Sequence, residues 1–189
     1  MVTAYLGLLA ALAAERLFEL SLSRRHAAWA RARGGCEVGR GHFRLMAVLH
    51  TSLLVGCAAE VLLLGRPFIP LLAAPMLLLV VLAQALRYWA VATLGPLWNV
   101  RVIVVPGAVA VDRGPYRLVR HPNYVAVVVE GLAVPLLYGA WITALVFTVL
   151  NAALLVVRIR CEEGALAAHM GYVERLGGRP RFLPRLLGG

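Results

Sequence analysis

The chain has 189 residues, of which 61% are hydrophobic and 15% charged, and its mean hydropathy is +0.81. A water-soluble fold cannot bury so much apolar surface, so the composition predicts one integral-membrane domain, 1–189. The formal net charge is +10, from 19 basic residues, all arginine, against 9 acidic ones. The arginines cluster between long apolar stretches, as in the loops of a membrane protein, and we therefore expect the lipid bilayer and no nucleic acid as a partner.

Five apolar stretches close to the length that a helix needs to cross a bilayer predict about five transmembrane helices. In chain order they are residues 2–22, about 44–64, 69–94, 124–137 and 141 to about 157. No Lys or Arg precedes the first stretch, which is therefore interpreted as a retained span rather than a signal peptide. The fourth and fifth spans are separated only by a short turn and form a helical hairpin. The predicted fold class is an all-α membrane protein.

The arginines indicate how the spans are oriented, because Lys and Arg accumulate in cytoplasmic loops. Only Arg66 lies on the opposite side from three clusters that follow the first, third and fifth spans. The clusters are Arg24, Arg25, Arg31, Arg33 and Arg40, then Arg101, Arg113, Arg117 and Arg120, then Arg175, Arg179, Arg181 and Arg185. We therefore expect the N-terminus outside the cell membrane, and the C-terminus and the functional residues on its cytoplasmic side.

The segments expected on the cytoplasmic side have features beyond those of simple connectors. Residues 95–123 contain four turn-forming dipeptides with proline and a β-branched run at 100–105, and ordered loops of this length are commonly functional. Residues 161–176 have helix formers with apolar residues at helical spacing, which predicts a cytoplasmic C-terminal helix packed against the core. Residues 23–35 fit either an interfacial amphipathic helix or a solvated basic connector.

Motifs of common soluble enzymes are missing from the sequence. There is no GxGxxG after a strand, no P-loop, no Gly-x-Ser-x-Gly and no His-Glu-x-x-His. Cys36, Cys57 and Cys161 have no CxxC spacing, so neither a disulfide framework nor a metal site is expected.

The first candidate site is the polar cluster at 114–124, which places two arginines, a histidine and two tyrosines at the mouth of the fourth span. Pro122 favours a helix start at that point, so His121 can present groups to an anion or ligand near the positive helix end. The same residues are equally consistent with interfacial anchors.

The second candidate site is the cluster Arg-Ile-Arg-Cys-Glu-Glu at 158–163, at the end of the fifth span. Arg158 and Glu162 are spaced i,i+4 and Arg160 and Glu163 i,i+3, so each pair shares a helix face. As surface salt bridges these pairs are worth under about 1 kcal/mol. Because both clusters flank one hairpin, they can also contribute to a single pocket.

Several polar residues fall inside the spans, where ionisable groups are costly and are functional candidates by default. They are Glu15, Glu60, Gln84, Arg87, Glu130 and Asn151. Glu130 is a candidate partner for Arg87, either in a contact that holds the helices together or at the wall of a pocket. Glu60 is expected near the outer surface. Trp98 and Asn99, in the loop after the third span, are candidates for lining the pocket.

The two clusters, in this order and spacing, resemble the integral-membrane isoprenylcysteine carboxyl methyltransferase family, which includes phospholipid methyltransferase-like proteins. The resemblance is carried by Gly114-Pro115-Tyr116, Arg120-His121-Pro122-Asn123-Tyr124 and residues 158–163, in a motif-bearing catalytic half at about 95–189. The N-terminal half resembles more loosely a bacterial branch that O-methylates alkylpyrones or related phenolic lipids. Residues 125–130 depart from the aromatic and glycine residues of the members that act on prenylcysteine.

The resemblance implies S-adenosyl-L-methionine as cofactor and a lipophilic acceptor that enters from the bilayer. It implies cofactor contacts for Leu118, Val119, Arg120, His121, Pro122, Tyr124 and Glu163, catalytic roles for Arg158 and Glu162, and leaves Trp98, Asn99 and Glu130 as candidates on the acceptor side. In-line methyl transfer needs the cofactor and the acceptor to be held in line more than it needs a metal, so no metal is expected. Arg158 can stabilise an anionic acceptor, whereas a neutral acceptor requires His121 or Glu162 as base.

Three other functions remain as alternatives to O-methylation of a polyketide-derived lipid or an isoprenylcysteine-type carboxylate. A phospholipid N-methyltransferase requires an amine acceptor, and a membrane reductase requires a nicotinamide cofactor. A small transporter or scaffold predicts no cofactor binding, but the two halves show no inverted repeat and the spans are few for a carrier.

Overall fold

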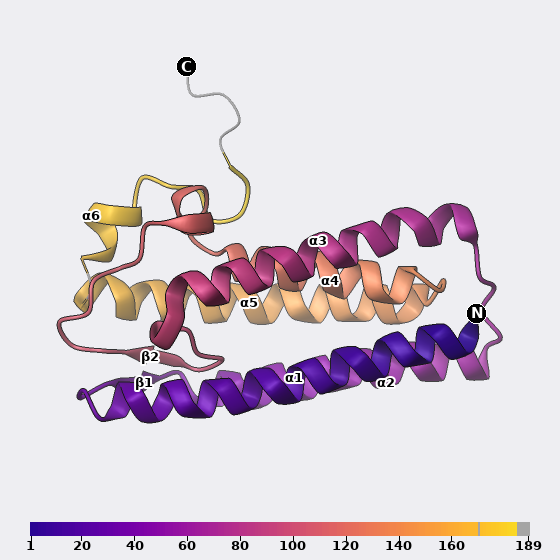
Figure 1. The fold of residues 1–189 in the computed structure, drawn as a ribbon, viewed down its shortest axis with the longest axis horizontal. Coiled ribbons are helices and arrows are strands. Elements are labelled where there is room, and N and C mark those ends of the chain that lie inside the picture. The colour runs from indigo at the N-terminus through magenta and orange to yellow at the C-terminus, as the bar shows by residue number, and fades with distance from the viewer. Residues whose placement is uncertain (170, 185–189) are drawn as a thin grey trace, which may run out of the picture.

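The computed structural model describes residues 1–169 and 171–184, and it is mostly helical. Its long helices are α1 (Val2–Arg31), α2 (Arg40–Leu63), α3 (Pro70–Leu94), α4 (Pro122–Leu136) and α5 (Trp141–His169). Successive helices run in alternating directions, with α1 and α2 along one side of the bundle and α3, α4 and α5 along the other (Figure 1). The chain also forms the short helices η1 (Gly95–Leu97), η2 (Gly114–Arg117) and α6 (Tyr172–Leu176).

Three helices in the described part of the chain, α2, α3 and α5, are long and apolar enough to cross a membrane. The shorter α4 has 15 residues and is also apolar. Glu15, Arg16 and Glu19 interrupt the apolar stretch of α1 and keep it out of this set. Large apolar side chains lie exposed on the helices, for example Leu63 and Leu71, which suits a surface in contact with lipid. The chain is therefore a membrane protein, while five spans stay a prediction.

The first helix extends further than predicted. Instead of ending near residue 22, α1 continues to Arg31, so residues 23–31 form neither a separate interfacial helix nor a connector. Glu19, Ser23, Ala27 and Ala30 are all buried at spacings of three or four residues, which shows that one face of α1 stays packed to its end.

A pair of short strands makes the all-α prediction wrong in detail. β1 (Cys36–Val38) pairs antiparallel with β2 (Val102–Val104), with Cys36 opposite Val104. The second strand comes from the β-branched run of the long loop, whose residues favour extended backbone. Arg101 donates to Glu37 (Nη1–Oε1 2.9 Å), and the strand pair thereby ties the α1–α2 connection to the loop after α3.

The C-terminal region also differs from the prediction. Residues 161–169, expected in a separate helix, continue α5 without a break, because they contain good helix formers and no proline. The chain turns at Gly171, which has a φ of +56°, and only α6 remains as a separate helix. Arg185 of the third arginine cluster lies outside the described residues.

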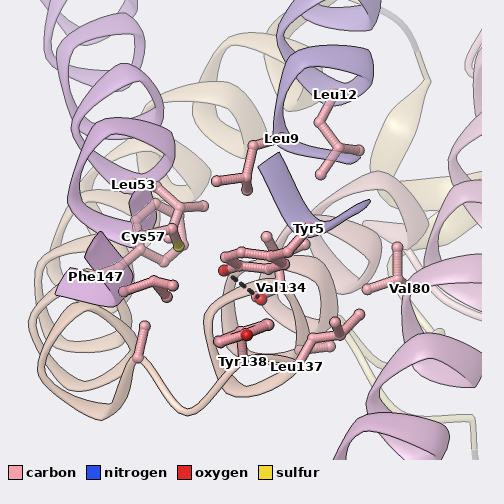
Figure 2. Close-up of a cluster of buried hydrophobic side chains, with 13 residues drawn as sticks. Tyr5, Leu9, Leu12, Leu53, Cys57, Val80, Val134, Leu137, Tyr138 and Phe147 are labelled. Atoms are coloured by element: carbon pink, nitrogen blue, oxygen red, sulfur yellow. Dashed lines mark hydrogen bonds between the residues drawn. The ribbon is translucent and has the colours of Figure 1, made fainter. Parts of the chain in front are cut away.

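The two ends of the bundle differ in character (Figure 1). The N-terminus lies near the α2–α3 and α4–α5 turns, while β1, β2 and α6 lie at the opposite end. Near the N-terminus, Tyr5 joins the two sides of the bundle: its hydroxyl donates to the carbonyl of Val134 (3.0 Å), and its ring lies 5.1 Å from that of Tyr138 (Figure 2). Glu60 lies at this end too, where it accepts bonds from the backbone N–H groups of Ile142 and Thr143 and thereby caps α5.

The hairpin of α4 and α5 depends on a glycine. A Cβ atom placed on Gly131 would lie 2.0 Å from Cε1 of Phe147, a buried ring on α5. We expect Gly131→Ala to lower the free energy of unfolding by about 1–3 kcal/mol, because the ring and helix must shift to admit a methyl group. Gly7→Ala is the matched control, since a Cβ at Gly7 meets nothing within 4 Å. Unfolding in detergent measures both variants, and equal effects would contradict this account of the packing.

Candidate functional site

A cavity of about 540 Å³ lies between the two sides of the bundle. Part of its wall is apolar and comes from α1 and α2, including Leu17, Leu20, Met46 and Leu54. A polar part of the wall comes from the loop after α3 and from α4, α5 and α6. The polar wall includes Trp98, Asn99, Tyr116, Arg120, His121, Asn123, Tyr124, Arg158, Glu162 and Tyr172. The cavity thus joins the two predicted clusters to an apolar space.

The first cluster is shaped by the start of α4. His121 precedes the helix and Pro122 occupies its first turn, where a missing N–H costs nothing. The His121 ring is buried and stacks on the Tyr124 ring, with centroids 5.3 Å apart and planes at 23°. Pro122 and Val119 are buried beside this stack without lining the cavity, whereas Leu118 is about half exposed.

The second cluster meets the first at the hydroxyl of Tyr124. Arg158, which is only 5% exposed, donates through Nε to this hydroxyl (2.7 Å) and through Nη2 to the carbonyl of Val100 (2.7 Å). The hydroxyl in turn donates to the carboxylate of Glu162. Arg158 and Glu162 are therefore connected through Tyr124, and the described residues include no direct salt bridge between them.

Glu163 has other partners than the sequence suggested. Its carboxylate lies 3.0 Å from Nη1 of Arg120, 3.0 Å from Nε2 of His121 and 2.7 Å from Nη2 of Arg181. Arg160 is exposed and makes no ion pair with any described residue, so the expected Arg160–Glu163 pair is wrong. The Glu163 carboxylate therefore contacts donors from the loop and the C-terminal region instead of Arg160 on its own helix.

A C-terminal strap, residues 177–184, lies across the His121 motif. The backbone N–H groups of Arg120 and His121 donate to the carbonyls of Pro180 (2.9 Å) and Arg181 (3.1 Å). Arg179 donates through Nη1 to the carbonyl of Tyr116 (2.5 Å). Sequence reasoning missed this strap, because Arg179 and Arg181 have no signal beyond their charge.

The loop before β2 is fixed to α1. Asn99 donates to the carbonyl of Ser23 (2.9 Å) and accepts a bond from the Ser23 hydroxyl (2.8 Å). The carbonyl of Trp98 accepts a bond from Nδ1 of His26 (2.8 Å). These contacts hold Val100 where its carbonyl can accept from Arg158.

The structure brings most of the predicted site residues to one place. Seven of them line the cavity: Trp98, Asn99, Arg120, His121, Tyr124, Arg158 and Glu162. Glu130 lies behind the wall and pairs with Arg87, which confirms the predicted contact. Sequence reasoning did not single out Tyr172, which also lines the cavity and whose burial raises its hydroxyl pKa to about 12.

Comparisons with known proteins cover most of the chain, including both clusters. Residues 76–168 match the Isoprenylcysteine carboxyl methyltransferase (ICMT) family, a range that contains Tyr124, Arg158 and Glu162. The uncharacterized protein YpbQ of Bacillus subtilis (strain 168) is 39% identical over 160 residues, which cover 84% of this chain and 94% of that protein. An uncharacterized protein of Haemophilus influenzae is 26% identical over 159 residues, 84% of this chain and 92% of its own. The chain belongs to the isoprenylcysteine carboxyl methyltransferase family, whose members are membrane methyltransferases that use S-adenosylmethionine.

Proposed function

We propose that the protein transfers a methyl group from S-adenosyl-L-methionine to an oxygen of a lipophilic acceptor at the cytoplasmic face of the membrane. The observation that carries this proposal is the cavity, in which the Arg158–Tyr124–Glu162 contacts face the same space as the apolar side chains of α1 and α2. An acceptor with a polar reacting group and an apolar body fits such a site.

The residues of the polar wall fit the cofactor. S-adenosyl-L-methionine presents an adenine ring, ribose hydroxyls and an amino-acid end, which call for aromatic rings, donors and acceptors. The wall has the rings of Tyr116, His121 and Tyr124, and among its buried polar atoms without a hydrogen bond to the described residues are Arg120 Nε and Asn123 Oδ1. A volume of about 540 Å³ also lies within the usual range of ligand sites.

The chain's own residues position and stabilise the acceptor. Nη1 of Arg158 makes no hydrogen bond within the described residues, so it can donate to an acceptor oxyanion while Nε and Nη2 hold the guanidinium still. Glu162 holds the Tyr124 hydroxyl and, through it, Arg158. When bound, the cofactor would supply a methyl group activated by its sulfonium sulfur, which would leave as the neutral thioether. An anionic acceptor has no proton to lose, and Glu162 is the base for a neutral one.

Among acceptors, we favour a polyketide-derived alkylpyrone or phenolic lipid, because its enol or phenol ionises readily and its chain is apolar. A prenylcysteine carboxylate is the second candidate, and phospholipid N-methylation the third. Arg158 favours an oxyanion over an amine, since an arginine beside the reacting atom repels a protonated amine.

The test uses protein purified in detergent with methyl-labelled S-adenosyl-L-methionine. Parallel reactions contain a long-chain alkylpyrone, a farnesylcysteine analogue and phosphatidylethanolamine, and mass spectrometry identifies the labelled product. Label on the alkylpyrone alone is the expected result. Label only on the prenylcysteine or on the amine would replace the proposed acceptor, and a protein that binds no cofactor would overturn the enzymatic proposal.

We expect His121→Ala to weaken cofactor binding before it affects turnover. The substitution removes a ring that stacks on Tyr124 and contacts Glu163, and a loss of about 1.4 kcal/mol corresponds to a tenfold higher Kd for the cofactor. Isothermal titration calorimetry measures this Kd, and kcat is measured at saturating cofactor. Arg117→Ala, an exposed residue of the same loop, serves as control. An unchanged Kd in His121→Ala would remove His121 from the proposed cofactor site.

A further inference from the structure

A second group of charged side chains lies inside the bundle, away from Arg158. Arg16 of α1 donates through Nη2 to both carboxylate oxygens of Glu130 on α4 (2.6 and 2.9 Å) and through Nη1 to Glu19. Arg87 of α3 also donates to Glu130, and its Nη1 lies 3.6 Å from Glu19. The group connects α1, α3 and α4 within segments that are otherwise apolar.

Burying charged side chains between apolar helices has a high free-energy cost. Glu19, Arg87 and Glu130 are each less than 10% exposed, and pairing offsets only part of the cost of removing charges from water. An apolar set of similar volume would pack these helices at no such cost. Ionisable residues kept at membrane depth therefore call for a function beyond packing.

The position of the group within the cavity indicates that function. We define the inner polar zone as Arg16, Glu19, His50, Thr51 and Arg87, all of which line the cavity. They come from α1 and α2 on one side of the bundle and from α3 on the other.

The spacing between this zone and the reacting end can be gauged along α4, because Arg16 and Arg87 of the zone both donate hydrogen bonds to Glu130 on that helix. On α4, Glu130 follows Tyr124 by six residues, which places it about 9 Å further along the helix axis. Between them Val127 contributes an apolar side chain to the cavity wall. The cavity therefore presents a polar end, an apolar interval and then a second polar zone.

The chemistry of the inner polar zone restricts what it can bind. Oε1 of Glu19 lies 3.6 Å from Nη1 of Arg87, too far for a hydrogen bond, and neither this oxygen nor Nε of Arg87 makes a hydrogen bond within residues 1–169 and 171–184, so each can still form one. Two arginines repel a cation, and the carboxylates of Glu19 and Glu130 repel an anion. A neutral group that both donates and accepts suits both unused atoms, and a hydroxyl is the simplest such group.

We propose that the inner polar zone binds a hydroxyl group on the acceptor, about 9 Å from the oxygen that receives the methyl group. This inference rests on the proposed function and narrows its substrate class to lipids hydroxylated on the chain. The zone is then a specificity site: an acceptor without the hydroxyl leaves buried polar atoms unpaired, which costs more than a missing apolar contact.

The first test compares two acceptors on the wild-type protein. One is a long-chain alkylpyrone with a hydroxyl on its chain about 9 Å from the ring hydroxyl, and the other is the same molecule without the chain hydroxyl. We expect at least about a tenfold higher kcat/KM for the hydroxylated acceptor. Equal kcat/KM values would overturn the inner polar zone as a specificity site while leaving the methyltransferase intact.

Direct binding separates this inference from the proposed function. If neither molecule is methylated, the proposed acceptor fails, but calorimetric titration of both molecules still measures the preference. A lower Kd for the hydroxylated molecule supports the zone, and equal Kd values overturn it.

A pair of variants locates the preference. Glu19→Leu removes the unused acceptor, and we expect the preference for the hydroxylated molecule to fall to within about twofold. Glu15→Leu is the matched control: Glu15 belongs to the same charged group, contacting Arg16 (3.4 Å) and Gln84 (2.7 Å), but does not line the cavity. A preference kept in Glu19→Leu, or lost equally in both variants, would contradict the assignment.

Discussion

Replacing Arg158 by lysine lowers kcat by about 10²-fold or more and leaves the Kd of S-adenosyl-L-methionine within about twofold of wild type. Lysine keeps the positive charge but lacks the fork of donors that contacts Tyr124 and the Val100 carbonyl together. The remaining ammonium is no longer held in place to meet an acceptor oxyanion. Single-turnover kinetics with the best acceptor measures the methyl-transfer step.

The control for this variant lies two residues away on the same helix. Arg160→Lys makes the same chemical change at an exposed side chain with no partner among the described residues, and we expect wild-type kinetics. Thermal unfolding and size-exclusion chromatography check that both variants fold. A kcat for Arg158→Lys near that of wild type would remove Arg158 from the reaction.

Replacing Glu130 by leucine lowers the free energy of unfolding by about 3–5 kcal/mol, the largest loss that we expect from any single substitution. The carboxylate accepts hydrogen bonds from both Arg16 and Arg87, and its removal leaves the buried guanidinium of Arg87 and the partly buried one of Arg16 with only Glu19 and Glu15 nearby. Reversible unfolding in mixed detergent micelles measures the difference.

A double variant shows whether the loss comes from unpaired charge or from lost volume. Arg87→Leu combined with Glu130→Leu removes a charge of each sign, and we expect it to recover part of the stability that Glu130→Leu loses. A double variant less stable than Glu130→Leu by the full cost of Arg87→Leu would show that the two side chains act independently.

Local patterns were sufficient to predict α2, α3, the apolar part of α5 and the start of α4, and to place the candidate site, but not the full lengths of α1 and α5. Hydropathy marks α2, α3 and α5 because each contains an apolar stretch near the length of a membrane span. The start of α4 was predictable from Pro122, which restricts the backbone on either side of it. Both clusters lie next to one hairpin, so short-range geometry alone brings Tyr124 and Arg158 together.

Contacts between segments that are far apart in the chain could not be predicted from the sequence. The bonds from Arg120 and His121 to residues 180 and 181 involve backbone atoms, which carry no residue-specific signal. β1 and β2 are three residues each, too short for alternation to reveal them. The partners of Glu163 depend on where the strap lies, whereas sequence spacing could suggest only a neighbour on the same helix.

The two sides of the bundle are fastened at both ends, which determines how the cavity between them can widen. At one end β1 pairs with β2, and Asn99 is bonded to Ser23; at the other end Tyr5 is bonded to Val134. Because the two sides are bonded to each other at both ends, they cannot separate by a hinge motion about one end. The proposed lipid acceptor would then enter between the two bonded ends, where room would have to come from bending of α1 and α2.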